Sequence, residues 1–235
     1  MILTSMRSGS HFLESSLKSH PLVETRGEMI NVQLREAKEQ RPKEREEDLL
    51  DECLKPQAPE TCTVGFIAHY SHLRAGKKNS FDRRKVLKHL LKKQDLRIIY
   101  LRRENLLAQM LSLELMMKYH LPHSTEYVQY DIVLDLQKCL NYFKDMEQLE
   151  SVSRDLFSGR EHMDVAYSSF LEHKDASLAR VQKFLGLPEH VLTTKHVKQN
   201  RKTLQEVITN YDEIAKALTG TKWESFLIDE PAFSG

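Results

Sequence analysis

The first twenty residues of this protein, MILTSMRSGSHFLESSLKSH (residues 1–20), decide its fold. Residues 1–4 are typical of a short buried strand, and residues 11–20 have apolar side chains spaced along one side of a helix. The polar loop 5–10 joins the two. Such a loop leaves backbone N–H groups pointing outward at the positive end of the helix dipole. The junction therefore predicts an anion site, and phosphate is the commonest ligand of this kind of site.

The side chains of the loop suit an anion. Gly9 allows the backbone to approach the ligand closely, Ser8 and Ser10 offer hydroxyl donors, and Arg7 offers a permanent charge with a fork of N–H groups. The loop lacks the Walker pattern G-x-x-x-x-G-K-[ST] and has no acidic residue to indicate a magnesium site. In the alternative interpretation Ser10 is only a helix N-cap, with Glu14 in the first turns. This stretch alone supports both interpretations equally.

A second strand-to-helix junction, IIYLRREN (residues 98–105), favours the anion interpretation. The helix after it has a polar stripe at positions i, i+4 and i+7, formed by Asn105, Gln109 and Ser112. Arg102 and Arg103 at the end of the strand, followed by a hydroxyl on this stripe, suit a second phosphate. The alternative is a solvated edge helix whose arginines pair with Glu104 or Glu114.

The rest of the chain continues the alternation of strands and helices. We expect further strands at residues 22–25, 62–68, 96–101 and 163–167, and helices at 81–93, 105–119, 128–149, 177–185 and 203–218. The highly charged residues 33–60 are interpreted as a solvated helical excursion rather than a binding arm. The pattern predicts an α/β fold with a mostly parallel central sheet flanked by helices on both faces, and one domain over residues 1–235. Ligands of such sheets bind beyond the carboxyl ends of the strands.

Composition excludes several classes of protein. The 235 residues carry 35 Lys+Arg and 34 Asp+Glu, a formal charge of +1, which argues against a protein that coats nucleic acid. No apolar run approaches the ~20 residues of a membrane span, and the N-terminus lacks the features of a signal peptide. Cys53, Cys62 and Cys139 are widely spaced, which suits reduced thiols in the cytoplasm and no metal site. A homodimer is left open.

Three later segments extend the pattern of the opening loop. They are YLRRENLLAQMLS (100–112), AYSSFLEHKDASLARVQKFLGLP (166–188) and HVKQNRKTLQEVITNYDEIAKALTGTKWESFL (196–227). Together with the strand–RSGS–helix junction, they resemble sulfotransferases that use 3′-phosphoadenylyl sulfate (PAPS). The last segment is most similar to the bacterial lipopolysaccharide and Nod-factor branch. The resemblance implies a P-loop-like sulfotransferase fold, PAPS as donor, PAP as product and no metal.

The resemblance also implies which residues bind the nucleotide. The 5′-phosphosulfate is assigned to the loop and the helix start, namely Arg7, Ser8, Gly9, Ser10, His11 and Phe12. The 3′-phosphate is assigned to a strand-end arginine with Ser112. The usual spacing is eight, whereas Arg103 stands nine and Arg102 ten residues before Ser112, and we favour Arg103. The basic segment Lys198, Gln199, Asn200 and Arg201 either closes over the phosphates or is a solvated loop.

Transfer of a sulfuryl group also needs a base and a countercharge. Arg7 is expected to neutralise the bridging oxygen as the phosphate leaves. Candidates for the base are Glu28, His69, His72 and His11. We favour Glu28 because it follows a predicted strand close to the carboxyl edge, and because a glutamate in a comparable segment is the base in the related trehalose-type sulfotransferases. Otherwise Glu28 pairs with Arg26 at the surface.

We therefore expect a sulfotransferase that acts on a hydroxyl or amine of a carbohydrate, glycolipid or small metabolite. The charged residues 33–60 and the segment 119–130 are candidates to line the acceptor cleft. Alternatives are a P-loop kinase of a small molecule and a non-catalytic nucleotide-binding relative. Trp223 and Phe226 are expected to pack onto the core rather than to stack on adenine.

Overall fold

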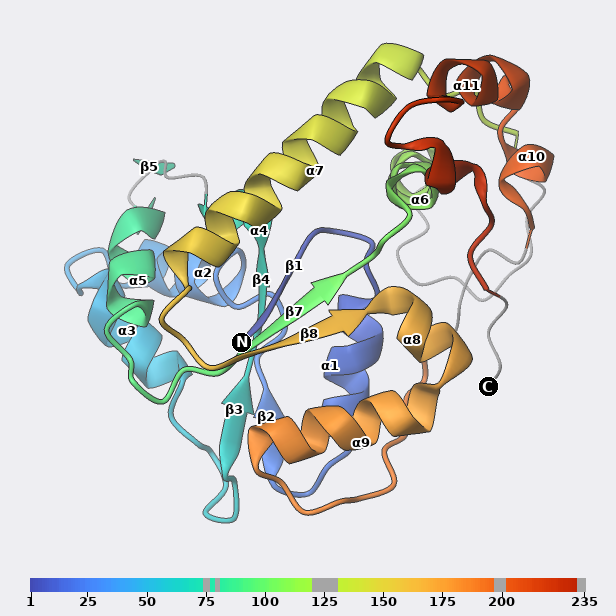
Figure 1. Cartoon of the computed structure of the whole chain (residues 1–235). Coiled ribbons are helices and arrows are strands. Elements are labelled where there is room, and N and C mark those ends of the chain that lie inside the picture. Colours follow the sequence, from blue (N-terminus) through green and yellow to red (C-terminus); the bar gives the residue numbers. More distant parts are fainter. Residues whose placement is uncertain (74–76, 79–80, 120–130, 197–201, 232–235) are drawn as a thin grey trace.

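The computed structural model describes residues 1–73, 77–78, 81–119, 131–196 and 202–231 (Figure 1). Its strands are β1 (Ile2–Thr4), β2 (Val23–Thr25), β3 (Thr63–Gly65), β4 (Ile67–His69), β5 (Lys77–Lys78), β6 (Phe81–Asp82), β7 (Ile98–Arg102) and β8 (His162–Ala166). Its helices are α1 (Ser10–Lys18), α2 (Gln33–Gln40), α3 (Glu46–Cys53), α4 (Tyr70–Leu73), α5 (Arg83–Leu90), α6 (Leu106–Tyr119), α7 (Leu136–Leu156), α8 (Tyr167–Glu172), α9 (Lys174–Leu185), α10 (Leu204–Val207), α11 (Tyr211–Leu218) and the 3₁₀ helix η1 (Glu224–Leu227).

The central sheet has four parallel strands in the order β4-β1-β7-β8. Strand β1 is central: Leu3 pairs with Ala68 of β4 on one side and with Tyr100 of β7 on the other. Parallel neighbours need crossover connections, and the helices between the strands supply them. All four strands therefore end at the same edge of the sheet, where loops follow β1 and β7, and β4 and β8 lead directly into α4 and α8.

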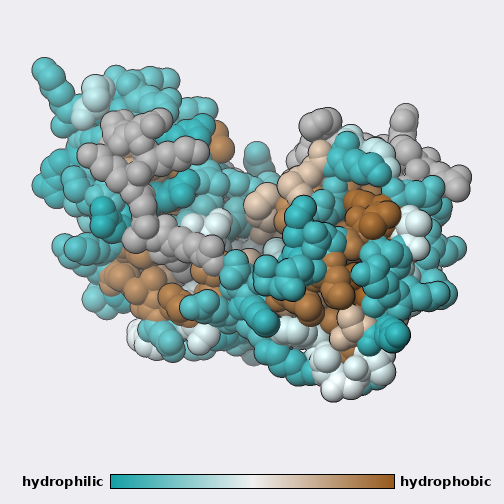
Figure 2. Space-filling view, turned by 90° about the horizontal axis from the view of Figure 1, so that it is seen from above, coloured by the Kyte–Doolittle hydropathy of each residue, from teal (hydrophilic) through white to brown (hydrophobic). Residues whose placement is uncertain are grey.

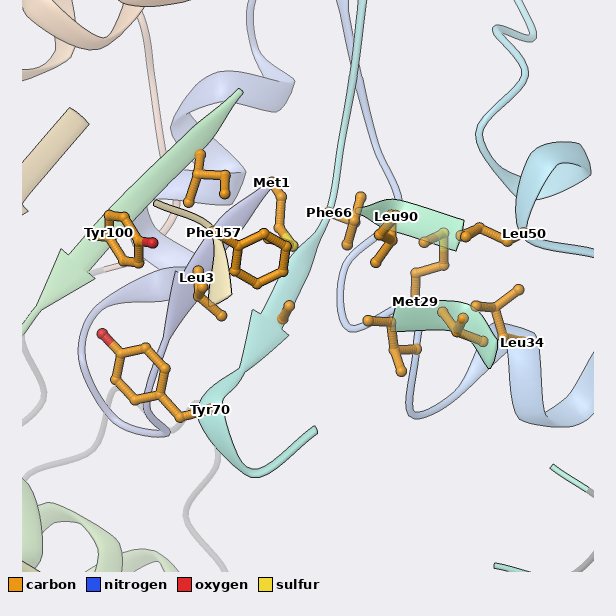
Figure 3. Close-up of a cluster of buried hydrophobic side chains, with 14 of the residues drawn as sticks. Met1, Leu3, Met29, Leu34, Leu50, Phe66, Tyr70, Leu90, Tyr100 and Phe157 are labelled. Atoms are coloured by element: carbon orange, nitrogen blue, oxygen red, sulfur yellow. The ribbon is translucent and has the colours of Figure 1, made fainter. Parts of the chain in front are cut away.

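Side chains alternate between the two faces of the sheet because successive residues of a strand point to opposite sides. Leu3 and Tyr100 join one hydrophobic cluster, whereas Ile2 and Ile99 join another that includes Leu13 of α1. In the first cluster Figure 3 shows Leu3, Tyr70, Tyr100 and Phe157 near the strands and Leu34, Leu50 and Leu90 on the helical side. The predicted α/β fold, with a parallel sheet and helices on both faces, is confirmed.

The predicted strand over residues 62–68 is wrong in one respect: the segment forms two strands in different sheets. Strand β3 pairs with β2 in a separate two-stranded sheet, and β4 enters the central sheet. The pairing changes at Gly27, whose carbonyl accepts a hydrogen bond from Ile67 N (2.8 Å). Gly27 has φ +51°, a conformation that favours glycine. The turn at Gly27 brings Glu28 to the end of β4.

The charged residues 33–60 form helices, as predicted, but they are not merely solvated. Leu34 of α2 and Leu49 and Leu50 of α3 are fully buried in the core cluster together with Met29. Helices α2 and α3 pack on each other and α3 packs on α5. Its leucines thus face the core, most of its charged residues face outward, and the two buried charges, Lys38 and Glu46, lie 3.8 Å apart.

Several helix boundaries differ from the predictions. Helix α7 begins after Asp135, whose carboxylate accepts a hydrogen bond from Lys138 N, rather than at residue 128. The predicted helix 203–218 is divided into α10 and α11, because Ile208 pairs with Ile132 between them. Residues 81–82 form a short strand before α5, and α8 is an additional helix that the sequence pattern did not indicate.

Trp223 and Phe226, near the C-terminus, pack on the core at α7, as predicted. The rings of Trp223 and Phe226 lie 5.6 and 5.2 Å from the ring of Phe143 in α7. Figure 2, seen from above, shows hydrophilic residues over most of this face and hydrophobic residues in separate areas among them. Within the described ranges no helix is long and apolar enough to cross a membrane.

Candidate active site

The loop between β1 and α1 is held by a buried network of hydroxyl groups. Thr4 Oγ1 donates to Leu101 O of β7 (2.6 Å), Ser8 Oγ donates to Ser5 O (2.6 Å), and the two hydroxyls are in contact. Thr4 and Ser8 are fully buried. The Ser8 hydroxyl is therefore occupied inside the protein, and what Ser8 can offer a ligand is its backbone N–H.

The backbone of this loop turns its carbonyl groups inward. Gln109 of α6 donates to Met6 O (2.8 Å), and Arg103 donates to Arg7 O (2.9 Å). Because the C=O and N–H of a trans peptide point in opposite directions, the N–H groups of Arg7 and Ser8 face away from these two side chains. Arg7 has φ +62°, rare for a residue other than glycine and frequent at functional sites.

The loop ends where α1 begins, and its last N–H groups are available. Gly9 has φ +84°, and neither its N–H nor that of Ser10 makes a hydrogen bond within the part of the chain described. No side chain caps α1. The interpretation of Ser10 as an N-cap is therefore wrong, and the helix end keeps donors directed at an anion.

Arg7 is positioned by α6. Its Nε donates to Ser112 Oγ (3.0 Å). Burial lowers the pKa of Arg7, and the charge of Arg103 lowers it further, although the guanidinium stays protonated at neutral pH. Ser112, which the resemblance assigned with Arg103, thus lies beside Arg7 in this structure.

Arg103 is enclosed by the protein itself. Its Nε and Nη2 donate to the two carboxylate oxygens of Glu230 (2.6 and 2.7 Å), and its guanidinium lies 5.0 Å from the ring centre of Tyr167. Burial alone would lower the pKa of Arg103, but the hydrogen bonds and charge of Glu230 outweigh it and raise that pKa. Arg102, the other candidate, is exposed at the end of β7.

The polar stripe of α6 holds neighbouring segments together. Gln109 is fully buried and also donates to Ser5 Oγ (2.7 Å). Asn105 donates to Phe226 O and Ile228 O and accepts from Ala108 N, which caps the helix. The alternative of a solvated edge helix is therefore wrong.

Glu28 lies between two imidazoles. Its Oε1 is 3.0 Å from His69 Nε2 and 3.4 Å from His11 Nε2, whereas Oε2 accepts no hydrogen bond from the described residues. The imidazole of His11 has the largest effect on the pKa of Glu28, and together with that of His69 it holds this pKa far below its ordinary value. The surface pair with Arg26 is wrong, because Arg26 binds Glu24 instead.

The candidate bases differ in exposure, which decides what each can meet. The side chains of His11 and Glu28 are 41% and 29% exposed, and that of His69 is 4% exposed. His72 is also buried, its Nδ1 accepts from His69 N (3.2 Å), and burial first, then His69 and Arg83, lower its pKa to about 3. Of the four candidates, Glu28 and His11 are therefore the ones whose side chains are accessible from the surface.

Register explains why these groups meet. Thr4 of β1 pairs with His69 of β4, so the loop that begins after Thr4 starts beside His69. His11 stands in the first turn of α1, directly after the loop, and Phe12 packs on Phe170 instead of facing the loop (ring centres 5.6 Å apart). Glu28, His11 and His69 thus lie beside the loop Arg7–Ser10, here called the anion loop, at the carboxyl edge of the sheet.

The sequence analysis did not identify two residues that lie at the site. The ring of Tyr167, the first residue of α8, packs against Gly9, where a Cβ would lie 2.7 Å from it. Glu230 reaches Arg103 from the C-terminal segment. The carboxyl-edge rule could have indicated Tyr167, because it follows β8, but the sequence carried no signal for Glu230.

The basic segment Lys198–Arg201 lies outside the described residues. His196, the last described residue before it, has its ring 6.3 Å from that of His11. The chain therefore enters this segment beside the start of α1. Among the residues that the structure describes, no group of three or more His, Cys, Asp or Glu is placed to hold a metal ion.

A parallel sheet with N–H groups that are unbonded among the described residues at the helix start after β1, and with an arginine after β7, is typical of α/β proteins that bind nucleotides at the carboxyl edge of the sheet. Residues 1–190 match the model of the Sulfotransferase family, and the chain belongs to this family. It is 24% identical over 234 residues to "Nodulation protein H" of Rhizobium tropici, covering 96% of this chain and 91% of that protein. The predicted family is confirmed, and the protein is an enzyme of the sulfotransferase class.

Proposed function

We propose that this enzyme transfers a sulfuryl group from PAPS to a hydroxyl or amine of a carbohydrate, glycolipid or small-metabolite acceptor. One observation carries the proposal: the anion loop Arg7–Ser10 and Glu28 lie at the same edge of the sheet. His11, which directly follows the loop, has its Nε2 3.4 Å from Glu28 Oε1. A donor held by its phosphosulfate on the loop would have a carboxylate within reach of the attacking group.

The loop suits the donor's charge. The chemistry that PAPS supplies is a sulfuryl group on a good leaving group, with negative charge that spreads over oxygen atoms during transfer. N–H groups at the start of α1 are fixed before the reaction, so they stabilise that charge without reorganising. Arg7, held in place by Ser112, meets the charge that grows on the departing phosphate oxygen.

Glu28 is the base in this proposal. As the acceptor oxygen forms its bond to sulfur, its proton passes to Glu28 Oε2, and the sulfur–oxygen bond to the phosphate breaks. In this proposal His69 and His11, whose Nε2 atoms lie 3.0 and 3.4 Å from Oε1, pair with that oxygen and leave Oε2 for the acceptor. The lowered pKa keeps Glu28 ionised at neutral pH but also makes it a weaker base, so the proton moves to Glu28 only as the acceptor bonds to sulfur and becomes more acidic.

The 3′-phosphate of the donor is assigned to Arg103, as the resemblance implies, whereas Ser112 is paired with Arg7. A cytoplasmic location, a single domain over residues 1–235, metal independence and a homodimer stay predictions. The acceptor class rests on the resemblance to the lipopolysaccharide and Nod-factor branch.

Binding and turnover test the proposal. We expect calorimetry to detect PAP binding in the presence of a chelator, and labelled PAPS to transfer its label to an acceptor from a panel of glycans, glycolipids and metabolites. Arg7→Ala should lower kcat about tenfold to a hundredfold, the value of one charge-assisted hydrogen bond. The matched control is Arg35→Ala, since Arg35 is half exposed on α2 and pairs only with Glu39 at 3.8 Å. No PAP binding, or binding that strictly requires magnesium, would contradict the proposal.

A further inference from the structure

The chain places one of its own carboxylates on the arginine assigned to a phosphate. Glu230 and Arg103 meet in a two-point, fork-to-fork geometry, and each side chain is only 10% exposed. Carboxylate and phosphate oxygens are recognised by a guanidinium in the same way. Glu230 therefore occupies the donors of Arg103 that a phosphate would use.

The segment before Glu230 is firmly attached. Asn105 donates to the carbonyls of Phe226 and Ile228, and Tyr211 donates to that of Leu227 (3.1 Å). Asp229 accepts from Leu204 N (2.7 Å). These bonds hold residues 226–229, directly before Glu230, against α6, α10 and α11.

Arg103 keeps its position without Glu230. Its Nη1 donates to Arg7 O, and its guanidinium lies on the ring of Tyr167. The charge of Arg7 is close enough to Arg103 to lower the pKa of Arg7. Two neighbouring guanidinium groups repel each other and are best satisfied by an anion, whether that anion comes from the chain or from a ligand.

A buried ion pair is a poor source of stability, because removing two charges from water costs about as much as their attraction returns. The pair as a whole therefore adds little net free energy of folding, although the loss of Glu230 alone leaves the charge of Arg103 buried and unpaired. An exchangeable carboxylate, by contrast, halves the positive charge of a two-arginine site until a ligand with more negative charge replaces it. A phosphate monoester carries about −1.5 to −2 charges at neutral pH, more than one carboxylate.

We propose that Glu230 is an internal competitor that closes the Arg103 anion site in the free enzyme and is displaced by the 3′-phosphate of the nucleotide. The inference rests on the proposed function and adds regulation of the same site. Nucleotide affinity then depends on the exchange of the Glu230 carboxylate for the 3′-phosphate, and the position of the Glu230 side chain depends on whether a nucleotide is bound.

The test compares Glu230→Gln with the matched control Glu224→Gln. Glu224 lies in the same segment, is exposed and, among the described residues, its carboxylate accepts only from Gly220 N, so its variant removes one charge without touching Arg103. Calorimetry measures binding of PAP and of adenosine 5′-phosphosulfate, which lacks the 3′-phosphate. Removing a charged competitor should tighten PAP binding by about tenfold to a hundredfold in Glu230→Gln and leave adenosine 5′-phosphosulfate unchanged.

A thermal readout separates exchange from loss of folding. Glu230→Gln leaves Arg103 without its anion, so its melting temperature should fall below that of the wild type, and saturating PAP should restore it to the value of PAP-bound wild type. PAP binding by Glu230→Gln alone also supports exchange. Unchanged or weaker PAP binding in Glu230→Gln, with normal binding by the wild type, overturns the inference and makes Glu230 a fixed partner of Arg103. No binding by wild type or either variant overturns the proposed donor, and this inference with it.

Discussion

Gly9→Ala tests the contact on which the shape of the anion loop depends. Gly9 has φ +84°, and an added Cβ would lie 2.7 Å from two ring atoms of Tyr167. The left-handed conformation costs alanine ~1–2 kcal/mol, and a rigid aromatic overlap adds ~1–3 kcal/mol. We therefore expect a loss of about 2–5 kcal/mol in the free energy of unfolding.

Gly220→Ala is the matched control for backbone strain. Gly220 has φ +74°, and nothing lies within 4 Å of an added Cβ, so this variant should lose only ~1–2 kcal/mol. Urea unfolding followed by fluorescence suits the comparison, because Trp223 is the only tryptophan of the chain and is buried. The difference between the two variants measures the overlap with the ring.

A double variant checks the cause. On a Tyr167→Ala background the ring is absent, so adding Gly9→Ala should cost no more than Gly220→Ala costs in the wild type. Gly9→Ala should also abolish PAP binding on the native background, since the loop must move away from Tyr167. Equal losses for Gly9→Ala and Gly220→Ala in the wild type, or an unchanged loss without the ring, would refute the reasoning.

The remaining predictions concern chemistry at the same edge. Glu28→Gln should lower kcat by about 10²–10⁴-fold with nearly unchanged PAP affinity, and near-normal turnover would remove Glu28 as the base. Because His11 and His69 lower the pKa of Glu28, the acid limb of the kcat/KM profile should lie below the ordinary carboxyl pKa of about 4.3. In His11→Gln this limb should move to higher pH. An unmoved limb would show that His11 does not lower the pKa of Glu28. His69→Asn should move the limb in the same direction with PAP binding intact, as expected for a positioning residue that never meets the acceptor. Ser112→Ala should lower kcat by releasing Arg7, and a loss confined to PAP affinity would instead place Ser112 on the 3′-phosphate.

Much of the site was accessible to sequence reasoning because its parts are local. The loop after β1 and the arginines after β7 are strand-to-helix junctions, and a parallel sheet brings such junctions to one edge. Glu28, His69 and His11 were each identified as candidates. Their grouping was not predictable, because it depends on the pairing of Thr4 with His69 and on the turn at Gly27.

Other features required contacts between distant segments. Ser112 was assigned with Arg103 from their spacing on the chain, but it lies beside Arg7, 105 residues away. Glu230 is 127 residues from Arg103, and one carboxylate among 34 acidic residues carries no pattern that identifies its partner. The division of residues 62–68 into two strands also escaped prediction, because one apolar run fits either sheet.

The sequence by itself determined the alternation of strands and helices, the anion loop and the family of this protein. These depend on periodicity, on turn residues and on short motifs, which act over a few residues and are read directly from the chain. Only the tertiary structure decided which side chains share the site, which histidines are buried and that a C-terminal glutamate covers Arg103. Those features follow from strand register and from the packing of the last segment on α6, where small differences in the free energy of many distant contacts select one arrangement.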